Sequence, residues 1–472
     1  MKQRPFLAPA RAFLAPALLS FVVLLSVNGF SQKALPSKNA HYGNYPADSS
    51  EPKKPWSWNL LFAPGTNKAA REKAVQKLES RVQASFNTLR AEFPGKYRRH
   101  LIFHVFFCPC DTLLYTMNTD VRLSGSGKVA SQPPSPPKPP DGQGGGVDKI
   151  DFNYATIDKE ANIKEKPDND AYKKNYIAVL PAKPTVDDSR ILAIMDTGLD
   201  PTMFPTGIKK LIWQDAKAPT LYNFLPGKPV GKFFDDHPEK HGSAVAGMAL
   251  GEIKNAKVYP ALMIMKVLDE TKTGSSFSVS CALSYAYQHH AQVINMSLGY
   301  YSNGRPDSIL NFYIRRCVHA NPNPITIFAA AGNIISNHDQ KLLCTKPGIQ
   351  NLLTTGHLFY PACLNVAYPH LISVTGVEDN LHFSCLYQNF SETYVTVGLV
   401  RKDPGLCCMY KFPYKVKYYE GTSFATPVVA GMVMNAMIAG PPGTGALTAL
   451  ASLMRPAITL KGVTVNGNYI PY

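Results

Sequence analysis

The sequence predicts an α/β fold, in which helices cover both faces of a mostly parallel central sheet, preceded by a small α+β unit. The main observation is that apolar runs of strand length alternate with helix-like stretches. The strand-like runs are 191–195, 261–268, 293–296, 325–329 and 371–374, and the helix-like stretches include 278–290 and 309–320. With 45% hydrophobic and 17% charged residues, the chain also has the composition of a globular protein.

The N-terminus has the features of an export signal. Lys2, Arg4 and Arg11 make it positive, and 13–27 is almost wholly apolar. We expect a signal peptide over 1–31 that is removed, because the apolar run is short for a membrane span. An uncleaved membrane anchor is the alternative. The mature protein is then expected to be secreted or otherwise extracytoplasmic, without a stable membrane span.

The segment after the signal predicts one amphipathic helix followed by strands. Apolar residues recur there in steps of three and four, which places them on one helix face: Val75, Leu78, Val82, Phe86, Leu89 and Phe93. Pro94 and Gly95 end the helix, and 101–107 is an apolar run of strand length. We therefore expect a small α+β unit within 32–130.

A segment rich in proline and glycine, SQPPSPPKPPDGQGGG at 131–146, has the composition of a linker. Proline stiffens its first half and glycine loosens its second half. We accordingly divide the chain into the α+β unit at 32–130, a linker at 131–147 and a large domain at 148–472.

Charge and cysteine content narrow the function classes. The net charge is +16, but the basic residues are scattered rather than clustered, so a nucleic-acid partner is not expected. Export makes disulfides plausible among the nine cysteines, although the pairing is not readable from sequence. Cys108 and Cys110 have the spacing of a metal-ligand pair, yet no second pair stands at a suitable distance, so zinc is not expected.

Asp196 and His241 both stand at positions that suit an active site. Asp196 comes directly after the apolar strand 191–195, in IMDTGLD, and active residues gather at the carboxyl ends of parallel strands. A turn aspartate is the alternative. The chain has no second Asp-Thr/Ser-Gly string that would suggest an aspartic protease. His241 opens HGSAVAG, whose small residues let a helix pack close to the sheet, although a histidine at a helix start is usually exposed and idle.

Two further residues complete a candidate set. Asn333 ends ITIFAAAGN, where its side-chain amide can donate to a developing negative charge; a turn asparagine is the alternative. Ser423 lies in GTSFATPVVAG, at the predicted start of the apolar helix that runs to Ala439. The free N–H groups of a helix start suit a nucleophile whose attack creates an oxyanion. An N-capping serine is the alternative.

These four segments, in the order Asp, His, Asn, Ser, resemble those of the subtilisin-like serine proteases over about 186–440. The resemblance implies a catalytic triad of Asp196, His241 and Ser423, with Asn333 as the oxyanion donor. The strings KVLDETKTGSS at 266–276 and VINMSLG at 293–299 resemble the two walls of the family's substrate cleft. The substrate-binding residues implied are Gly274, Ser275, Ser276, Ser297, Leu298, Gly299, Ala330, Ala331 and Gly332.

The resemblance also implies partners. Protein or peptide substrates are expected, together with the chain's own propeptide at 32–130, which is cut in or just after the linker. No cofactor is expected; calcium stays an open alternative without support, because the carboxylate expected near Pro205 is missing. Tyr300 stands where the family usually has glycine and is expected to reshape the main specificity pocket.

Three other functions are alternatives to that of a general endopeptidase. A catalytically silent binding protein on the same fold is disfavoured, because all four functional side chains are present. A protease that cuts only itself is left open by the sequence. A lipase-like hydrolase is disfavoured, because no Gly-x-Ser-x-Gly elbow precedes a helix.

Overall fold

The structure is a computed structural model and describes a defined set of residues. These are 57–92, 102–120, 147–152, 155–157, 180–216, 219–254, 258–302, 307–333, 351–354, 358–378, 381, 388–400, 409–415 and 417–471. The expected signal peptide at 1–31 and the segment 131–146 lie outside them. The chain divides into two compact units, 1–41 and 42–472, and all the described residues belong to the second.

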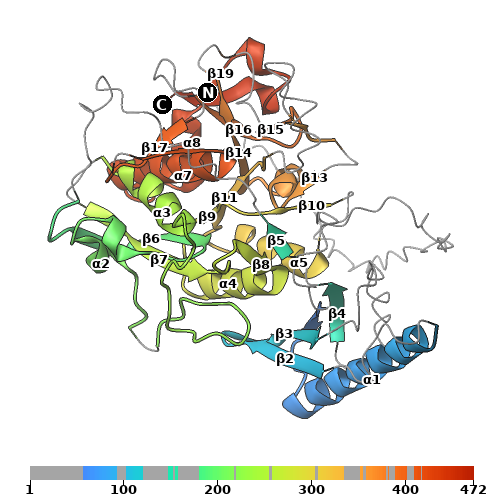
Figure 1. Cartoon of the computed structure of the whole chain (residues 1–472). Coiled ribbons are helices and arrows are strands. Elements are labelled where there is room, and N and C mark those ends of the chain that lie inside the picture. The colour runs from blue at the N-terminus through green and yellow to red at the C-terminus, as the bar shows by residue number, and fades with distance from the viewer. Residues whose placement is uncertain are drawn as a thin grey trace, which may run out of the picture. The chain divides into compact units, whose positions relative to one another are not determined.

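The large domain is built on an eight-stranded sheet with the order β19-β20-β16-β14-β11-β9-β6-β7 (Figure 1). Neighbouring strands run parallel, except for β19 and β20 at one edge. The predicted mostly parallel sheet is therefore confirmed. Its strands are β6 (Thr185–Asp196), β7 (Val258–Lys266), β9 (Val293–Met296), β11 (Thr326–Ala330), β14 (Leu371–Val377), β16 (Val397–Val400), β19 (Arg455–Pro456) and β20 (Asn468–Pro471).

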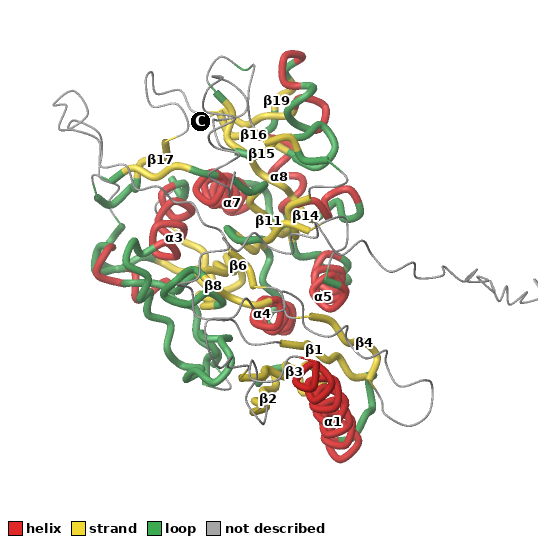
Figure 2. The backbone as a smooth tube through the Cα atoms, turned by 45° about the vertical axis from the view of Figure 1, so that its right-hand side comes forward, coloured by secondary structure: helices red, strands yellow, loops and turns green. Residues whose placement is uncertain are grey.

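Helices cover both faces of this sheet, as Figure 2 shows. Along β6, Leu192 and Ile194 join one hydrophobic core, while Ala193 and Met195 join the other, because successive strand residues point to opposite faces. The first core is shared with α3 (His241–Gly251), α7 (Thr422–Ala439) and α8 (Ala446–Leu453). The second is shared with α4 (Ser276–Gln288) and α5 (Ser308–Val318).

Shorter elements connect these layers. They are β5 (Ala155–Ile157), β8 (Thr273–Ser275), β10 (Tyr300–Ser302), β12 (Asn351–Leu352), β13 (Leu358–Tyr360), β15 (Asn389–Phe390), β17 (Met409–Lys411), β18 (Tyr418–Glu420), α2 (Ile208–Leu211) and the 3-10 turns Pro201–Met203, Ala362–Val366, Ile458–Leu460 and Val465–Gly467. Four small two-stranded sheets result, which pair β10 with β13, β12 with β15, β17 with β18, and β5 with β8.

The helix α7 has the length and hydropathy of a membrane span, and no other helix among the described residues does. Of its apolar window, 72% is buried inside the protein. The apolar helix predicted to run to Ala439 is thus a mostly buried helix of the core. Pro427 lies inside the helix and gives the Ser423 carbonyl no N–H, and that carbonyl accepts a hydrogen bond from the Ser297 hydroxyl instead.

The N-terminal unit consists of β1 (Ser57–Phe62), α1 (Lys68–Glu92), β2 (Ile102–Cys108), β3 (Asp111–Asp120) and β4 (Val147–Phe152). One face of α1 packs on the sheet β2-β3-β1-β4, as the periodicity predicts, with Val75, Leu78, Val82 and Phe86 buried. The side chains of Leu89 and Phe93 are outside the description.

The boundary of this unit differs from the predicted one. After the proline-rich segment, β4 pairs antiparallel with β1, so residues up to Phe152 belong to the N-terminal sheet. The predicted division between 147 and 148 therefore cuts through a strand. The composition of the segment 131–146 suggested a linker between domains. In the structure, this part of the chain lies between β3 and β4, which belong to the same sheet.

The helices α3 and α7 pack against each other through a glycine. A methyl group added at Gly431 of α7 would overlap the backbone carbonyl oxygen of Ala249 in α3. Since that obstacle is backbone, it cannot rotate away. The contact fixes the distance between the two helices that begin at the candidate active site.

We expect Gly431→Ala to lower the free energy of unfolding by about 1–3 kcal/mol, the usual cost of overpacking a core. Gly462→Ala is the matched control, because a methyl group there meets nothing within 4 Å. Urea unfolding of both, in the Ser423→Ala chain to prevent self-digestion, measures the difference. Equal losses for the two variants would contradict the close-packing argument.

Candidate active site

The four predicted catalytic residues lie at one edge of the large sheet. Asp196 is the last residue of β6, and Asn333 follows β11. His241 is the first residue of α3, and Ser423 is the second residue of α7. The carboxyl ends of parallel strands meet at the same edge, so the fold brings these distant segments together.

Asp196 and His241 form a buried pair. The Asp196 Oδ1 lies 2.7 Å from Nδ1 of His241, and each side chain is 1% exposed. The same carboxylate oxygen accepts a hydrogen bond of 2.8 Å from the backbone N–H of Thr197. Because Nδ1 is held in this way, Nε2 is the ring nitrogen that can exchange a proton with a third group.

The residue after Ser423 packs against this pair. The imidazole of His241 lies against Phe424, with 5.2 Å between ring centroids. Ser423 precedes Phe424 and is fully buried; its Oγ donates to the carbonyl of Ser297 at 3.4 Å. In return, the Oγ of Ser297 donates to the carbonyl of Ser423 at 2.7 Å. The start of α7 is thereby fixed on the loop after β9.

Asn333 is oriented by the residue next to Ser423. Its side-chain oxygen accepts hydrogen bonds from the backbone N–H of Thr422 at 3.0 Å and from the Thr422 hydroxyl at 3.3 Å. Gly332 has φ +93, a backbone conformation that glycine adopts readily, and its N–H donates to the same hydroxyl at 3.1 Å. The carboxamide is thus held with its oxygen toward α7.

The sequence did not single out Asp235, although it links both halves of the pair. It is fully buried and accepts hydrogen bonds from the Thr197 hydroxyl at 2.8 Å and from the N–H and hydroxyl of Ser243 at 2.8 and 2.7 Å. Burial raises the pKa of Asp235. Its position six residues before His241, in an otherwise charged loop, gave no signal of burial.

The nine residues predicted to bind substrate fall into three groups. Ser297, Leu298 and Gly299 follow β9, and Ala330, Ala331 and Gly332 end and follow β11, so these two groups flank the start of α7. Gly274 and Ser275 lie on β8, and Ser276 begins α4.

Phe359, rather than Tyr300, occupies the space between the first two groups. The hydroxyl of Tyr300 accepts a hydrogen bond of 2.9 Å from the N–H of Asp307, and its ring is buried against Tyr360. A methyl group at Gly299 or at Gly332 would instead overlap the ring of Phe359. The sequence did not single out Phe359, because nothing local shows that its ring meets Gly299 and Gly332.

One group of potential metal ligands appears among the described residues, and it is formed by Cys108, Cys110 and Cys281. Cys108 and Cys281 are joined in a disulfide, so they offer no thiolate to a metal. The sequence paired Cys108 with Cys110 as possible ligands and could not foresee Cys281. Cys344, Cys385, Cys407 and Cys408 lie outside the described residues.

His237 lies beside the pair, in the loop before α3. Burial lowers the pKa of His237 to about 4, and the nearby Lys272 adds to this effect. Its Nδ1 accepts a hydrogen bond of 3.2 Å from the N–H of Glu239, which requires the unprotonated nitrogen. The folded state therefore favours neutral His237.

This preference predicts a pH dependence of stability. In the unfolded chain a histidine has a pKa of about 6.5, so the stabilisation is complete above that pH and is lost as the pH falls toward 4. We expect the free energy of unfolding of the Ser423→Ala chain to decrease over this range, and His237→Asn to reduce the decrease. Urea unfolding at several pH values measures both. His290→Asn, at an exposed histidine, should leave the decrease unchanged; if His237→Asn does too, the assignment is wrong.

Comparisons with known proteins point to one family. The model of the subtilase family matches residues 187–455. An intracellular serine protease of Paenibacillus polymyxa is 31% identical over 199 residues, which cover 40% of this chain and 51% of that protein. The chain thus spans about half the length of this curated relative.

A solved structure is similar in fold. The epidermin leader peptide processing serine protease of Staphylococcus aureus aligns with a TM-score of 0.51 and 14% sequence identity. The alignment covers 89% of this chain and 98% of that one. At this identity the likeness supports the fold alone.

Proposed function

Because the chain belongs to the subtilase family, we propose that it is a serine endopeptidase with Asp196, His241 and Ser423 as its catalytic triad. One observation carries the proposal: the buried Asp196–His241 pair is held against the first turn of α7, which contains Ser423. Nucleophilic catalysis by serine requires such a base within reach of the serine hydroxyl, and the packing of His241 on Phe424 supports this by bringing the ring to the residue next to Ser423.

The chemistry follows from the positions of the three side chains. Ser423 Oγ attacks the peptide carbonyl, while Nε2 of His241 takes its proton and then gives it to the leaving amine. Asp196 holds Nδ1–H and stabilises the charged ring. Water then hydrolyses the acyl-enzyme by the same route. No step calls for a cofactor.

Asn333 and the Ser423 backbone N–H supply the oxyanion hole. The side-chain oxygen of Asn333 is directed toward Thr422, so its NH₂ group is the end that donates to the tetrahedral intermediate. Removing one such donor lowers kcat by about a hundred- to a thousand-fold, a magnitude that comes from subtilisin, a member of this family.

We extend the proposal to the cellular setting and the partners. Export by the signal at 1–31 gives a secreted or otherwise extracytoplasmic enzyme that acts on proteins or peptides. The N-terminal unit serves as a propeptide. Since β4 belongs to that unit, the cut that frees it lies beyond Phe152 rather than in the linker.

One observation favours self-processing as a second function. The short strand β5 comes directly after the N-terminal unit and pairs antiparallel with β8, with Thr156 opposite Gly274. This edge carries predicted substrate-binding residues. The chain therefore presents its own backbone where a substrate strand is expected.

A labelling experiment tests the catalytic assignment. A fluorophosphonate probe should label the processed wild type after treatment with dithiothreitol, which opens the Cys108–Cys281 disulfide, and this sample should also digest casein, whereas Ser423→Ala should do neither. Ser280→Ala, at a buried serine of α4, is the matched control and should be labelled like the wild type. Labelling without digestion would favour self-processing alone, and a processed wild type that takes no label would refute the peptidase.

The ring of Phe359 fills the space between Gly299 and Gly332. We therefore expect the enzyme to prefer substrates with a small side chain next to the cleaved bond. Phe359→Ala should raise kcat/KM for a peptide with a large side chain there, relative to one with alanine, by about tenfold or more. This ratio does not depend on the folded fraction. Tyr300→Phe is the control and should leave the ratio unchanged. A ratio that stays constant in Phe359→Ala would contradict the assignment.

A further inference from the structure

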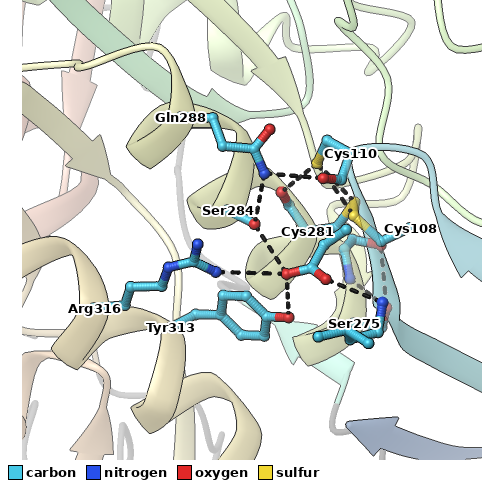
Figure 3. Close-up of a disulfide and its surroundings, with 11 residues drawn as sticks. Cys108, Cys110, Ser275, Cys281, Ser284, Gln288, Tyr313 and Arg316 are labelled. Carbon is cyan, nitrogen blue, oxygen red and sulfur yellow. Dashed lines mark hydrogen bonds and ion pairs between the residues drawn. A yellow bond between two sulfur atoms is a disulfide. The ribbon is translucent and has the colours of Figure 1, made fainter. Parts of the chain in front are cut away.

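The N-terminal unit is covalently joined to the peptidase domain. Cys108, at the end of β2, forms a disulfide with Cys281 in the middle of α4, as Figure 3 shows. The two residues are 173 positions apart, and both side chains are fully buried. Any peptide bond cut between them leaves two polypeptides that this disulfide still connects.

Polar contacts surround the disulfide (Figure 3). The carboxylate of Asp111, at the start of β3, accepts hydrogen bonds from Tyr313 at 2.8 Å and from Ser284 at 3.2 Å, and lies 3.6 Å from Arg316. Gln288 of α4 donates to the backbone carbonyl of Cys110 at 2.9 Å. The β2–β3 turn is therefore seated on α4 and α5 by oriented contacts.

A second contact lies closer to the expected substrate edge. The side chain of Asn59, in β1, donates to the hydroxyl of Ser276 at 2.9 Å, and both residues are fully buried. Ser276 begins α4 directly after β8, the strand that pairs with β5. The helix that carries Cys281 thus begins at the edge that β5 covers.

We propose that the Cys108–Cys281 disulfide makes the N-terminal unit a tethered inhibitor, which stays on the peptidase after processing and is released when a dithiol reduces the bond. The inference rests on the proposed peptidase function. In the reduction, two electrons and two protons pass from the dithiol to the two sulfurs. Two cysteine thiols form, and the dithiol becomes a disulfide.

The tether changes how inhibition depends on dilution. Two parts joined by a short connection meet at an effective concentration of about millimolar, whatever the concentration of the whole protein. The N-terminal unit therefore keeps its contact with Ser276, directly after β8, even in very dilute, oxidised protein. Once the disulfide is reduced, the two parts separate on dilution like any noncovalent complex.

Cys110 is a third sulfur beside the bond. Its Sγ lies 3.2 Å from that of Cys108 and 3.8 Å from that of Cys281. Its attack on Cys108 would form a Cys108–Cys110 disulfide and free Cys281, breaking the tether; its attack on Cys281 would preserve the tether. Only the thiolate attacks, and burial raises the pKa of Cys110 to about 12. At neutral pH the tether therefore persists until an external dithiol acts.

The test compares dilution in two redox states. Wild-type protein is allowed to process itself, diluted from about micromolar to about nanomolar, and labelled with the fluorophosphonate probe with or without dithiothreitol. The oxidised protein should be labelled slowly at every concentration. Reduction should speed labelling of the dilute sample by about tenfold or more. Equal labelling rates of the oxidised and reduced samples at nanomolar concentration would overturn the tethered-inhibitor proposal.

Two variants isolate the disulfide. Cys281→Ala removes the sulfur on the peptidase side and should be labelled rapidly on dilution without reductant. Cys108→Ala is a weaker choice, because Cys110 lies close enough to Cys281 to replace it. Cys110→Ala is the matched control, and it should respond to reductant as the wild type does. A slow Cys281→Ala, or a Cys110→Ala that needs no reductant, would count against the assigned pairing.

A separate measurement distinguishes failure of the tether from failure of the peptidase proposal. The Ser423→Ala chain is nicked with trypsin, the cut is located by mass spectrometry, and the thiols are alkylated. With a cut between residues 108 and 281, the two fragments should migrate together without reductant and separately with it. Separation without reductant overturns the tether. Fragments that stay joined, in a protein whose wild type takes no label in either redox state, support the tether and refute the peptidase.

Discussion

The buried carboxylate of Asp235 is the interaction on which the candidate active site depends. It binds Thr197, which follows Asp196, and Ser243, which lies in the same helical turn as His241. The strand end and the helix start are thereby locked together. A buried carboxylate is costly unless it is hydrogen-bonded, and here four donors serve it, since the His237 N–H also donates to it at 3.3 Å. The geometry of the Asp196–His241 pair is thus set by a residue outside it.

Much of the fold and the four central residues were predictable, because their signals are local. An apolar run followed by a polar residue marks the strand ends at Asp196 and Asn333. Small residues mark the tightly packed helix start at His241. Once the strands are parallel, their carboxyl ends must share an edge, so local strings imply a common site.

The features that the sequence did not reveal depend on pairing between distant segments. A segment rich in proline and glycine has the same composition whether it separates domains or joins two strands, so β4 was assigned to the wrong side. The pairing of Cys108 with Cys281 was one of many open to nine cysteines. The burial of Phe359 against Gly299 and Gly332 needs three chain segments to meet.

The position of β4 in the sequence, after the proline-rich segment, matters for the design of recombinant fragments. Within the N-terminal sheet, β1 lies between β3 and β4. A recombinant fragment that stops before Val147 lacks β4 and leaves one side of β1 with unpaired N–H and C=O groups. Such an edge recruits strands from other chains and promotes aggregation. An expression boundary placed after Phe152 keeps the sheet complete.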